Sequence, residues 1–331
     1  MMKLRWTTIV CALAATLGAE AQADSGGPLK IVLPEGLSPR TVGYYLAQDK
    51  GYFAAAGLHV SFAASGDAAP SAVLAKGQAD LAVELMPVAL NRREEGDDLV
   101  LIAQIFRRAG MELVCRATVD RPAALKNHVV GVYFDGLESS FYAWMSALGL
   151  NPFGGPGSVT VLRQNFGLDA FQRSQADCAT SYSYRAPLDF AALGLKLADM
   201  KLYRYDDAGV ATLEDGLYAR SADLARPDRV AQFAAFLGAV TKGWRFAHNN
   251  PKAAFDLIHA DPAFANVDAA ALRQAIDAVD ALVAPESGPI GKLDRMAYNQ
   301  TVNLLLTAAP DPVLTKAPAG AVTDAVWKAM K

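Results

Sequence analysis

Side chains that could recognise a small molecule gather around the short apolar runs of this sequence. Aromatic rings, amides and carboxylates lie near several segments that are typical of β-strands. In open α/β sheets ligands bind beyond the carboxyl ends of the strands, so we expect most of these residues to line one site. The candidate ligand-binding residues are Glu35, Tyr44, Ser65, Glu84, Phe106, Tyr133, Phe134, Glu138, Gln164, Phe166, Tyr182 and Tyr184.

Several of these candidates have a plain structural interpretation beside the functional one. Tyr44 and Phe166 are equally compatible with core packing and with a binding cleft. Tyr182 and Tyr184 are two residues apart, which would place both rings on one face of a strand, and the cleft is favoured for them. Glu138 begins an expected helix, where a carboxylate either favours the helix N-terminus or accepts from a ligand N–H. Stacking on such rings suits a flat heterocycle.

Motifs for catalysis and for cofactors are missing from the sequence. It has no phosphate-binding G-x-x-x-x-G-K-[ST] loop, no G-x-G-x-x-G after a strand, and no H-E-x-x-H or G-x-S-x-G motif. The four histidines are scattered, and none has a His or Cys three or four residues away. We therefore expect no catalytic residues, no metal and no cofactor.

Length and composition narrow the class of protein. The chain has 331 residues, of which 52% are hydrophobic and 20% charged, with a net charge of −3. This allows two or three domains with their own cores, and it excludes a basic nucleic-acid binder and a disordered chain. The start carries Lys3 and Arg5, an apolar run over 6–17, and a small-x-small pattern at 21–23. These features predict a signal peptide over 1–23, cleaved near Ala23, and an exported protein.

After that cleavage two cysteines remain, Cys115 and Cys178. An oxidising compartment would permit a disulfide between them. The apolar neighbourhood of Cys115 favours a buried free thiol instead. The sequence leaves both states open.

Two units of alternating strands and helices predict the fold class. Strands are expected over 29–33, 58–62 and 81–83, with helices over 41–49, 70–76 and up to about 95. The pattern restarts with strands over 129–133, 159–162 and 176–180, and helices follow from about 228. We expect an α/β protein of two lobes, each a mostly parallel sheet flanked by helices, with the chain crossing near 115–120 and 215–222. Lobe 1 would comprise 24–117 and 218–331, and lobe 2 would comprise 118–217.

An ordered set of short motifs carries a family resemblance over roughly 29–260. The sequence resembles periplasmic substrate-binding proteins of the thiamine-precursor and sulfonate group, which serve ABC importers and share a fold with eukaryotic thiamine-pyrimidine synthases. The matching segments are Gly43-Tyr44-Tyr45-Leu46-Ala47, Lys50-Gly51-Tyr52-Phe53-Ala54, Gly57-Leu58-His59-Val60, Gly77-Gln78-Ala79-Asp80-Leu81-Ala82-Val83, Val130-Gly131-Val132 with Gly136 and Glu138, Gln164-x-Phe166, Ala176-Asp177-Cys178-Ala179, Asp207-x-Gly209, Pro227-x-x-Val230 and Gly243-Trp244.

The resemblance implies a type II periplasmic-binding-protein fold and a binding protein, not an enzyme. Such a protein would act as a monomer in the periplasm, close on a small molecule and deliver it to its ABC permease in the inner membrane. The first ligand class is a planar heterocycle such as a thiamine pyrimidine precursor. Relatives often carry Tyr-Asn-Glu where this chain has Tyr182-Ser183-Tyr184, so no single relative's ligand is inherited.

Two alternatives follow from the same resemblance. A sulfonate or another small organic anion would need cationic donors, and Arg40, Arg107 and Arg185 are available. An enzyme like the thiamine-pyrimidine synthases would need a pyridoxal-phosphate lysine and a cysteine-rich iron motif. No lysine lies between Gly51 and Lys76 and no cysteine cluster exists, which argues against the enzyme.

Overall fold

The structure is a computed structural model that describes residues 28–284, 287–308 and 312–330. The expected signal peptide over 1–23 lies outside the described residues. In the part of the chain that the structure describes, no helix is both long enough and apolar enough to cross a membrane.

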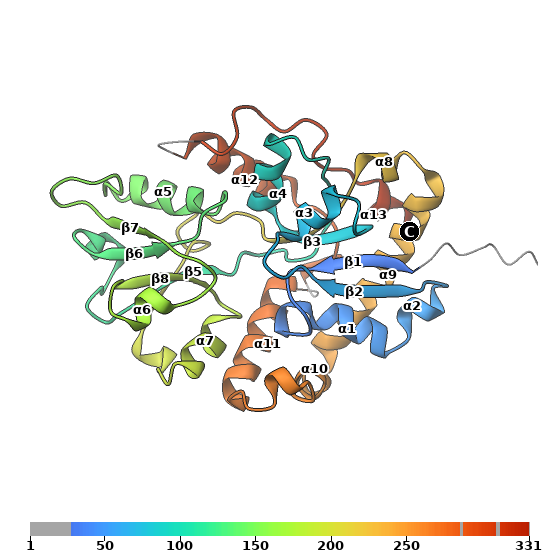
Figure 1. Ribbon diagram of the computed structural model, residues 1–331, viewed down its shortest axis with the longest axis horizontal. Helices are drawn as coiled ribbons and strands as arrows, with labels where there is room; N and C mark the ends of the chain where they lie inside the picture. The colour runs from blue at the N-terminus through green and yellow to red at the C-terminus, as the bar shows by residue number, and fades with distance from the viewer. Residues whose placement is uncertain (1–27, 285–286, 309–311, 331) are drawn as a thin grey trace, which may run out of the picture.

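The strands form two separate five-stranded sheets. Figure 1 shows them in two lobes, with β1, β2 and β3 in one and β5, β6, β7 and β8 in the other. Each sheet has two parallel and two antiparallel strand pairings, so both sheets are mixed and not mostly parallel as expected. The first sheet has the order β2 (Val60–Ala64), β1 (Leu29–Leu33), β3 (Leu81–Leu85), β10 (Asp215–Ala219), β4 (Val100–Gln104), and the second has the order β7 (Thr160–Arg163), β6 (Val129–Val132), β8 (Cys178–Tyr182), β5 (Met111–Cys115), β9 (Lys201–Arg204).

Helices lie between the strands and after the last one. Strands β1, β3, β4 and β5 are almost wholly buried, which is why their sequences are mostly apolar. The helices are α1 (Val42–Asp49), α2 (Tyr52–Ala55), α3 (Pro70–Ala75), α4 (Met86–Glu94), α5 (Glu138–Ala147), α6 (Asp169–Gln172), α7 (Ala186–Ala192), α8 (Ser221–Leu224), α9 (Pro227–Asn249), α10 (Pro251–His259), α11 (Ala269–Val283), α12 (Arg295–Thr307) and α13 (Ala325–Ala329).

The expected two-lobed α/β fold is confirmed. The strand order of the two sheets also shows where the chain crosses from one lobe to the other. The sequence placed the crossings near 115–120 and 215–222. Strand β5 belongs to the second sheet and β10 to the first, so both crossings lie earlier in the chain than that. The expected boundaries at 117 and 218 would cut these strands from their sheets. We propose lobe boundaries within 105–110 and 205–214 instead.

Helix α9 packs against α1 with almost no room between them. A Cβ on Gly243 would lie 2.1 Å from the carbonyl oxygen of Gly43, and a Cβ on Gly43 would lie 2.1 Å from the ring of Trp244. Two glycines therefore let these helix backbones touch. This packing covers one face of the first sheet and explains why both motifs occur in the sequence.

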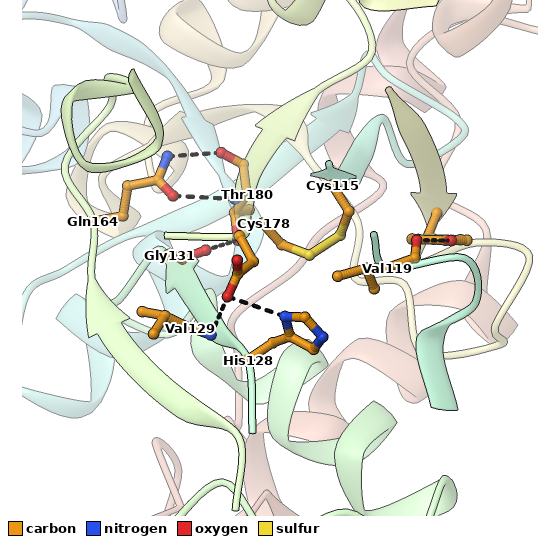
Figure 2. Close-up of a disulfide and its surroundings, with 10 residues drawn as sticks. Cys115, Val119, His128, Val129, Gly131, Gln164, Cys178 and Thr180 are labelled. Carbon is orange, nitrogen blue, oxygen red and sulfur yellow. Dashed lines mark hydrogen bonds and ion pairs between the residues drawn. A yellow bond between two sulfur atoms is a disulfide. The ribbon is translucent and has the colours of Figure 1, made fainter. Parts of the chain in front are cut away.

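A disulfide joins Cys115 to Cys178, which are directly paired on the antiparallel strands β5 and β8 (Figure 2). The two Cα atoms are 4.0 Å apart, and both side chains are fully buried. The interpretation of a free thiol is therefore wrong. An apolar neighbourhood indicates that Cys115 is buried. It cannot show that Cys178 lies opposite, because strand β5, which carries Cys115, was not predicted.

Candidate functional site

A cleft of about 790 Å³ lies between the two lobes. Its first wall comes from the segments that follow β1, β2 and β3, and its second wall from those that follow β6, β7 and β8. These are the carboxyl ends of the strands, where the topology of open α/β sheets places ligands. Eight of the sequence-predicted residues line it: Glu35, Ser65, Glu84, Tyr133, Phe134, Gln164, Phe166 and Tyr182.

Aromatic rings form a continuous row along the second wall. Phe166 is 55% exposed and packs against Tyr133, with ring centroids 4.8 Å apart. Tyr133 stacks on Tyr182 at 5.8 Å, and Tyr182 stacks on Tyr184 at 5.3 Å. The row thus runs from the open cleft into the buried centre of the molecule, and its outer end offers ring surface to a ligand.

The amide of Gln164 is held by its own lobe. Its Oε1 accepts from the N–H of Thr180 at 3.1 Å, and its Nε2 donates to the Thr180 carbonyl at 2.8 Å (Figure 2). The side chain lies over Gly131, where a Cβ would be 2.3 Å from Oε1. Gln164 therefore links the end of strand β7 to the middle of strand β8. Its amide is engaged within its own lobe, so its main role in the cleft wall is structural.

Two aromatic candidates, Tyr44 and Phe106, lie in the core and not along the cleft. Tyr44 is 1% exposed and meets Trp244 edge to face at 5.9 Å. Phe106 is fully buried between Trp244 and Tyr184. Each ring fills the space beside the close α1–α9 contact, which the sequence alone did not reveal.

The other two candidates outside the cleft are Tyr184 and Glu138. Strand β8 ends at Tyr182, so Tyr184 follows in a turn and the expected shared strand face with Tyr182 is not formed. Tyr184 is 2% exposed and stands 5.9 Å from the guanidinium of Arg40. Glu138 starts α5 and accepts from the N–H of Gly136 at 2.9 Å, so its carboxylate orders the turn before the helix.

A buried ion pair lies at the base of the cleft, which its Arg40 lines. Arg40 Nε donates to Asp215 Oδ2 at 2.8 Å, and Nη2 donates to Oδ1. Burial by itself would lower the pKa of Arg40, but the charge and hydrogen bond of Asp215, together with Tyr184 and Glu35, outweigh burial and the pKa is raised. Arg185 also lines the cleft, whereas Arg107 lies elsewhere, against Gly288. Sequence reasoning missed Asp215, because its strand β10 was not foreseen.

Buried carboxyl groups stand near this pair. Glu84 is 3% exposed and accepts from Ser71 Oγ at 2.8 Å and from the N–H of Leu85 at 2.9 Å. Burial raises the pKa of Glu84, and these donors oppose the shift. The base of the cleft is thus rich in acidic groups.

Glu214 joins the two segments that connect the lobes. Its Oε1 accepts from the N–H of Gly110 at 2.7 Å and of Met111 at 2.8 Å, while its Oε2 is buried without a hydrogen-bond partner in the described residues. Burial raises the pKa of Glu214 to about 8, and the neighbouring charge of Asp215 adds to the shift. One crossing segment therefore holds the backbone of the other through a carboxyl group that sits directly behind the cleft.

The family model described as "NMT1/THI5 like" matches residues 38–254, which is most of the chain. The chain belongs to this family. The resemblance expected from the motifs is confirmed. None of the curated proteins compared with this NMT1/THI5-like protein matches its sequence.

Solved structures similar to this NMT1/THI5-like protein share its periplasmic-binding-protein fold. The alkanesulfonate-binding protein SsuA from Xanthomonas axonopodis pv. citri, bound to MOPS, has a TM-score of 0.62 at 15% identity over 89% of this chain and 98% of its own. The Candida albicans CA3427 gene product, with the generic periplasmic binding protein fold, has a TM-score of 0.60 at 15% identity over 92% and 94%. The desulfurization enzyme DSZB has a TM-score of 0.57 at 16% identity over 91% and 98%.

Two further hollows lie on the outer side of the first lobe of this NMT1/THI5-like protein. One, of about 660 Å³, runs along α9 between Tyr52 and Met330, and the other, of about 910 Å³, lies beside Lys30 and Asp80. Both take their residues from one lobe and lie away from the carboxyl ends of the strands. The cleft is the better candidate site, because both lobes contribute to it.

Proposed function

We propose that this protein is the extracytoplasmic solute-binding component of an ABC importer. Its lobes would close on a small planar heterocycle, such as a thiamine pyrimidine precursor, and deliver it to a permease in the inner membrane. Family membership and the two-lobed fold support the transport role. We further propose that the chain is exported to the periplasm and acts there as a monomer without a cofactor.

The exposed ring of Phe166 is the observation that carries the ligand class. Several large apolar side chains of this protein are exposed, but Phe166, at 55%, is exposed within the cleft, where its ring is accessible to a ligand. Phe166 stands beside Tyr133 on the second wall, so a flat ring that enters the cleft can stack on it. Ring stacking contributes roughly 0.5–1.5 kcal/mol beyond the burial of area.

Thermal-shift screening against thiamine precursors, flavins, nucleobases and sulfonates tests the ligand class, because a ligand raises stability by mass action. We expect a planar nitrogen heterocycle to raise the melting temperature. If sulfonates alone raise it, the heterocycle is wrong and the organic-anion alternative takes its place. Calorimetry with the best ligand then gives the affinity on which variants are compared.

The chain offers a matched pair of variants for the stacking role. Phe166→Ala should lower the affinity for the ligand about tenfold, since it removes the exposed ring of the cleft. Phe153 is 52% exposed on the same lobe but does not line the cleft, so Phe153→Ala should leave the affinity unchanged. Equal effects of the two variants would contradict the assignment of Phe166 to the binding site.

We also propose that the chain is not an enzyme of the pyridoxal-phosphate type. Among the described residues that line the cleft, none is a lysine, and a Schiff base needs one. The purified protein should therefore show no pyridoxal absorbance. A yellow protein with that absorbance would overturn this proposal and leave the fold assignment untouched.

A further inference from the structure

Every arginine that lines the cleft already has a carboxylate partner. Arg40 is the most buried, and its bidentate contact with Asp215 engages two of its three nitrogens. An anion entering the cleft would compete with these internal partners for each guanidinium. The pairs are Arg40–Asp215, Arg92–Asp97, Arg163–Asp135 and Arg185–Asp189.

Carboxylates of the first wall lack such compensation. Glu35, Asp67, Glu84 and Glu95 all line the cleft. Within the described ranges, no arginine, lysine or histidine forms an ion pair with any of them. In the described part of the chain, Glu35 accepts only from the hydroxyl of Ser38, at 2.6 Å. Hydroxyl and amide donors satisfy oxygen atoms, but they bring no full positive charge.

The surplus is concentrated at the base of the cleft. There the guanidinium of Arg40 interacts with the carboxyl groups of Asp215, Glu35, Glu84 and Glu214, and the guanidinium of Arg185 interacts with Glu35. Burial raises the pKa of both Glu84 and Glu214 because it disfavours their charged forms, and the charge of Asp215 adds to the shift of Glu214. A positive charge supplied by a ligand would favour the charged forms of these carboxyl groups.

The second wall also attracts cations. The guanidinium of Arg163 lies over the ring of Phe134 at 4.7 Å, and Phe134 lines the cleft. Aromatic faces carry negative electrostatic potential, so the exposed ring of Phe166 presents a similar surface to the cleft. Carboxylates on one wall and ring faces on the other are the groups that recognise organic cations.

We propose that the ligand of this cleft is a cation, a planar nitrogen heterocycle that carries a positive charge between the rings of the second lobe and the carboxylates of the first. This inference rests on the proposed function, because it requires the cleft to take a small molecule. It separates the two ligand classes that the sequence left open, since a sulfonate would add negative charge beside Glu35 and Glu84.

Three one-ring probes of similar size test the charge directly. 1-Methylnicotinamide is a cation, nicotinamide is neutral and pyridine-3-sulfonate is an anion. Calorimetric titration at low ionic strength should give the tightest binding for the cation and the weakest for the anion, and salt should reduce the difference. Binding of nicotinamide as tight as that of its methylated form, or tighter binding of the sulfonate, overturns the charge assignment while the proposed function stands.

A pair of charge variants locates the effect in the cleft. Glu35→Gln keeps an oxygen for Ser38 and removes one charge, so it should weaken binding of 1-methylnicotinamide about tenfold and leave nicotinamide little changed. Asp199→Asn makes the same change of charge at an exposed position outside the cleft and should alter neither. Equal loss for both probes in Glu35→Gln would show a shape effect and contradict the inference.

The outcome in which none of the probes binds is also decisive. If the wider thermal-shift screen then yields a ligand, an anionic or neutral ligand overturns the charge assignment, and a cationic one supports it. If the screen and the probes both fail, the proposed function fails with the inference.

Discussion

Gly136 of the second lobe lies against Pro87 of the first at the rim of the cleft. A Cβ on Gly136 would stand 2.9 Å from the carbonyl oxygen of Pro87. Gly136 follows β6 and has a φ of +102°, and Pro87 is in the first turn of α4. The lobes therefore touch in this arrangement, and a side chain at position 136 would keep them apart.

Gly136→Ala should weaken ligand binding about tenfold, because the methyl group collides with Pro87 whenever the lobes close. Small-angle scattering with saturating ligand should show a larger radius of gyration than for the unaltered protein. Calorimetry gives the affinity on the same samples.

Gly154→Ala is the control for backbone strain. Gly154 has a φ of +97°, close to that of Gly136, but a Cβ there would meet nothing within 4 Å. Both variants should lose a similar amount of stability, about 1 kcal/mol, from the left-handed backbone. If Gly154→Ala weakens binding as much as Gly136→Ala does, the contact with Pro87 has no role in closure.

Two glycines of helix α9 should respond in opposite directions to the same substitution. Gly243→Ala forces a methyl group into the carbonyl oxygen of Gly43 and should cost about 2 kcal/mol or more of unfolding free energy. Gly238→Ala meets only Met330, at 3.6 Å, and should be neutral or stabilise by up to about 1 kcal/mol through helix propensity. Urea denaturation measures both, and a neutral Gly243→Ala would refute the close α1–α9 packing.

Removal of the disulfide should lower stability without changing the cleft. Cys115 and Cys178 are 63 residues apart, and closing a loop of that length stabilises by about 4 kcal/mol in the chain-entropy model. The double variant Cys115→Ala/Cys178→Ala should lose that order of unfolding free energy and become indifferent to reductant. Ligand affinity should stay the same, since neither cysteine lines the cleft. If Cys115 and Cys178 react as free thiols after the unaltered protein is denatured without reductant, the disulfide is contradicted.

Glu214 should make stability fall as pH rises. Its pKa is about 8 in the folded protein, against an ordinary value of 4.5, so between these pH values the folded state binds a proton that the unfolded state has lost. The contribution is therefore most favourable below pH 4.5 and is lost as pH rises toward 8. Glu214→Gln resembles the protonated form and should flatten this decline in urea denaturation, while Asp199→Asn should not. An unchanged pH dependence in Glu214→Gln would show that the pKa of the Glu214 carboxyl group is not raised in the folded protein.

The sequence predicted much of the fold because local patterns decide it. The apolar run that forms β1 and the face of α9 defined by Phe233, Leu237 and Val240 are visible without tertiary information. Strands β4, β5, β9 and β10 were not foreseen. Their membership of a sheet depends on partners far along the chain, as in the pairing of β10 with β3 and β4.

The candidate site was predictable in outline for a similar reason. Knowing where strands end locates Glu35, Ser65 and Phe166 on the cleft, since topology alone decides this. The positions of strand ends do not show which aromatic rings pack in the core. Tyr44 and Phe106 were therefore expected at the cleft, although they lie in the core. Ion pairs such as Arg40–Asp215 also escape it, because 175 residues separate the two partners.

The second lobe is one uninterrupted stretch of chain whose first and last strands are neighbours. Strands β5 and β9 pair antiparallel, with Glu112 opposite Arg204, and the disulfide lies wholly within this stretch. The polypeptide thus enters and leaves this lobe at two adjacent strands. The second lobe can therefore be exchanged as one segment, by evolution or by design. Such an exchange replaces the aromatic wall of the second lobe and leaves the acidic wall of the first lobe intact.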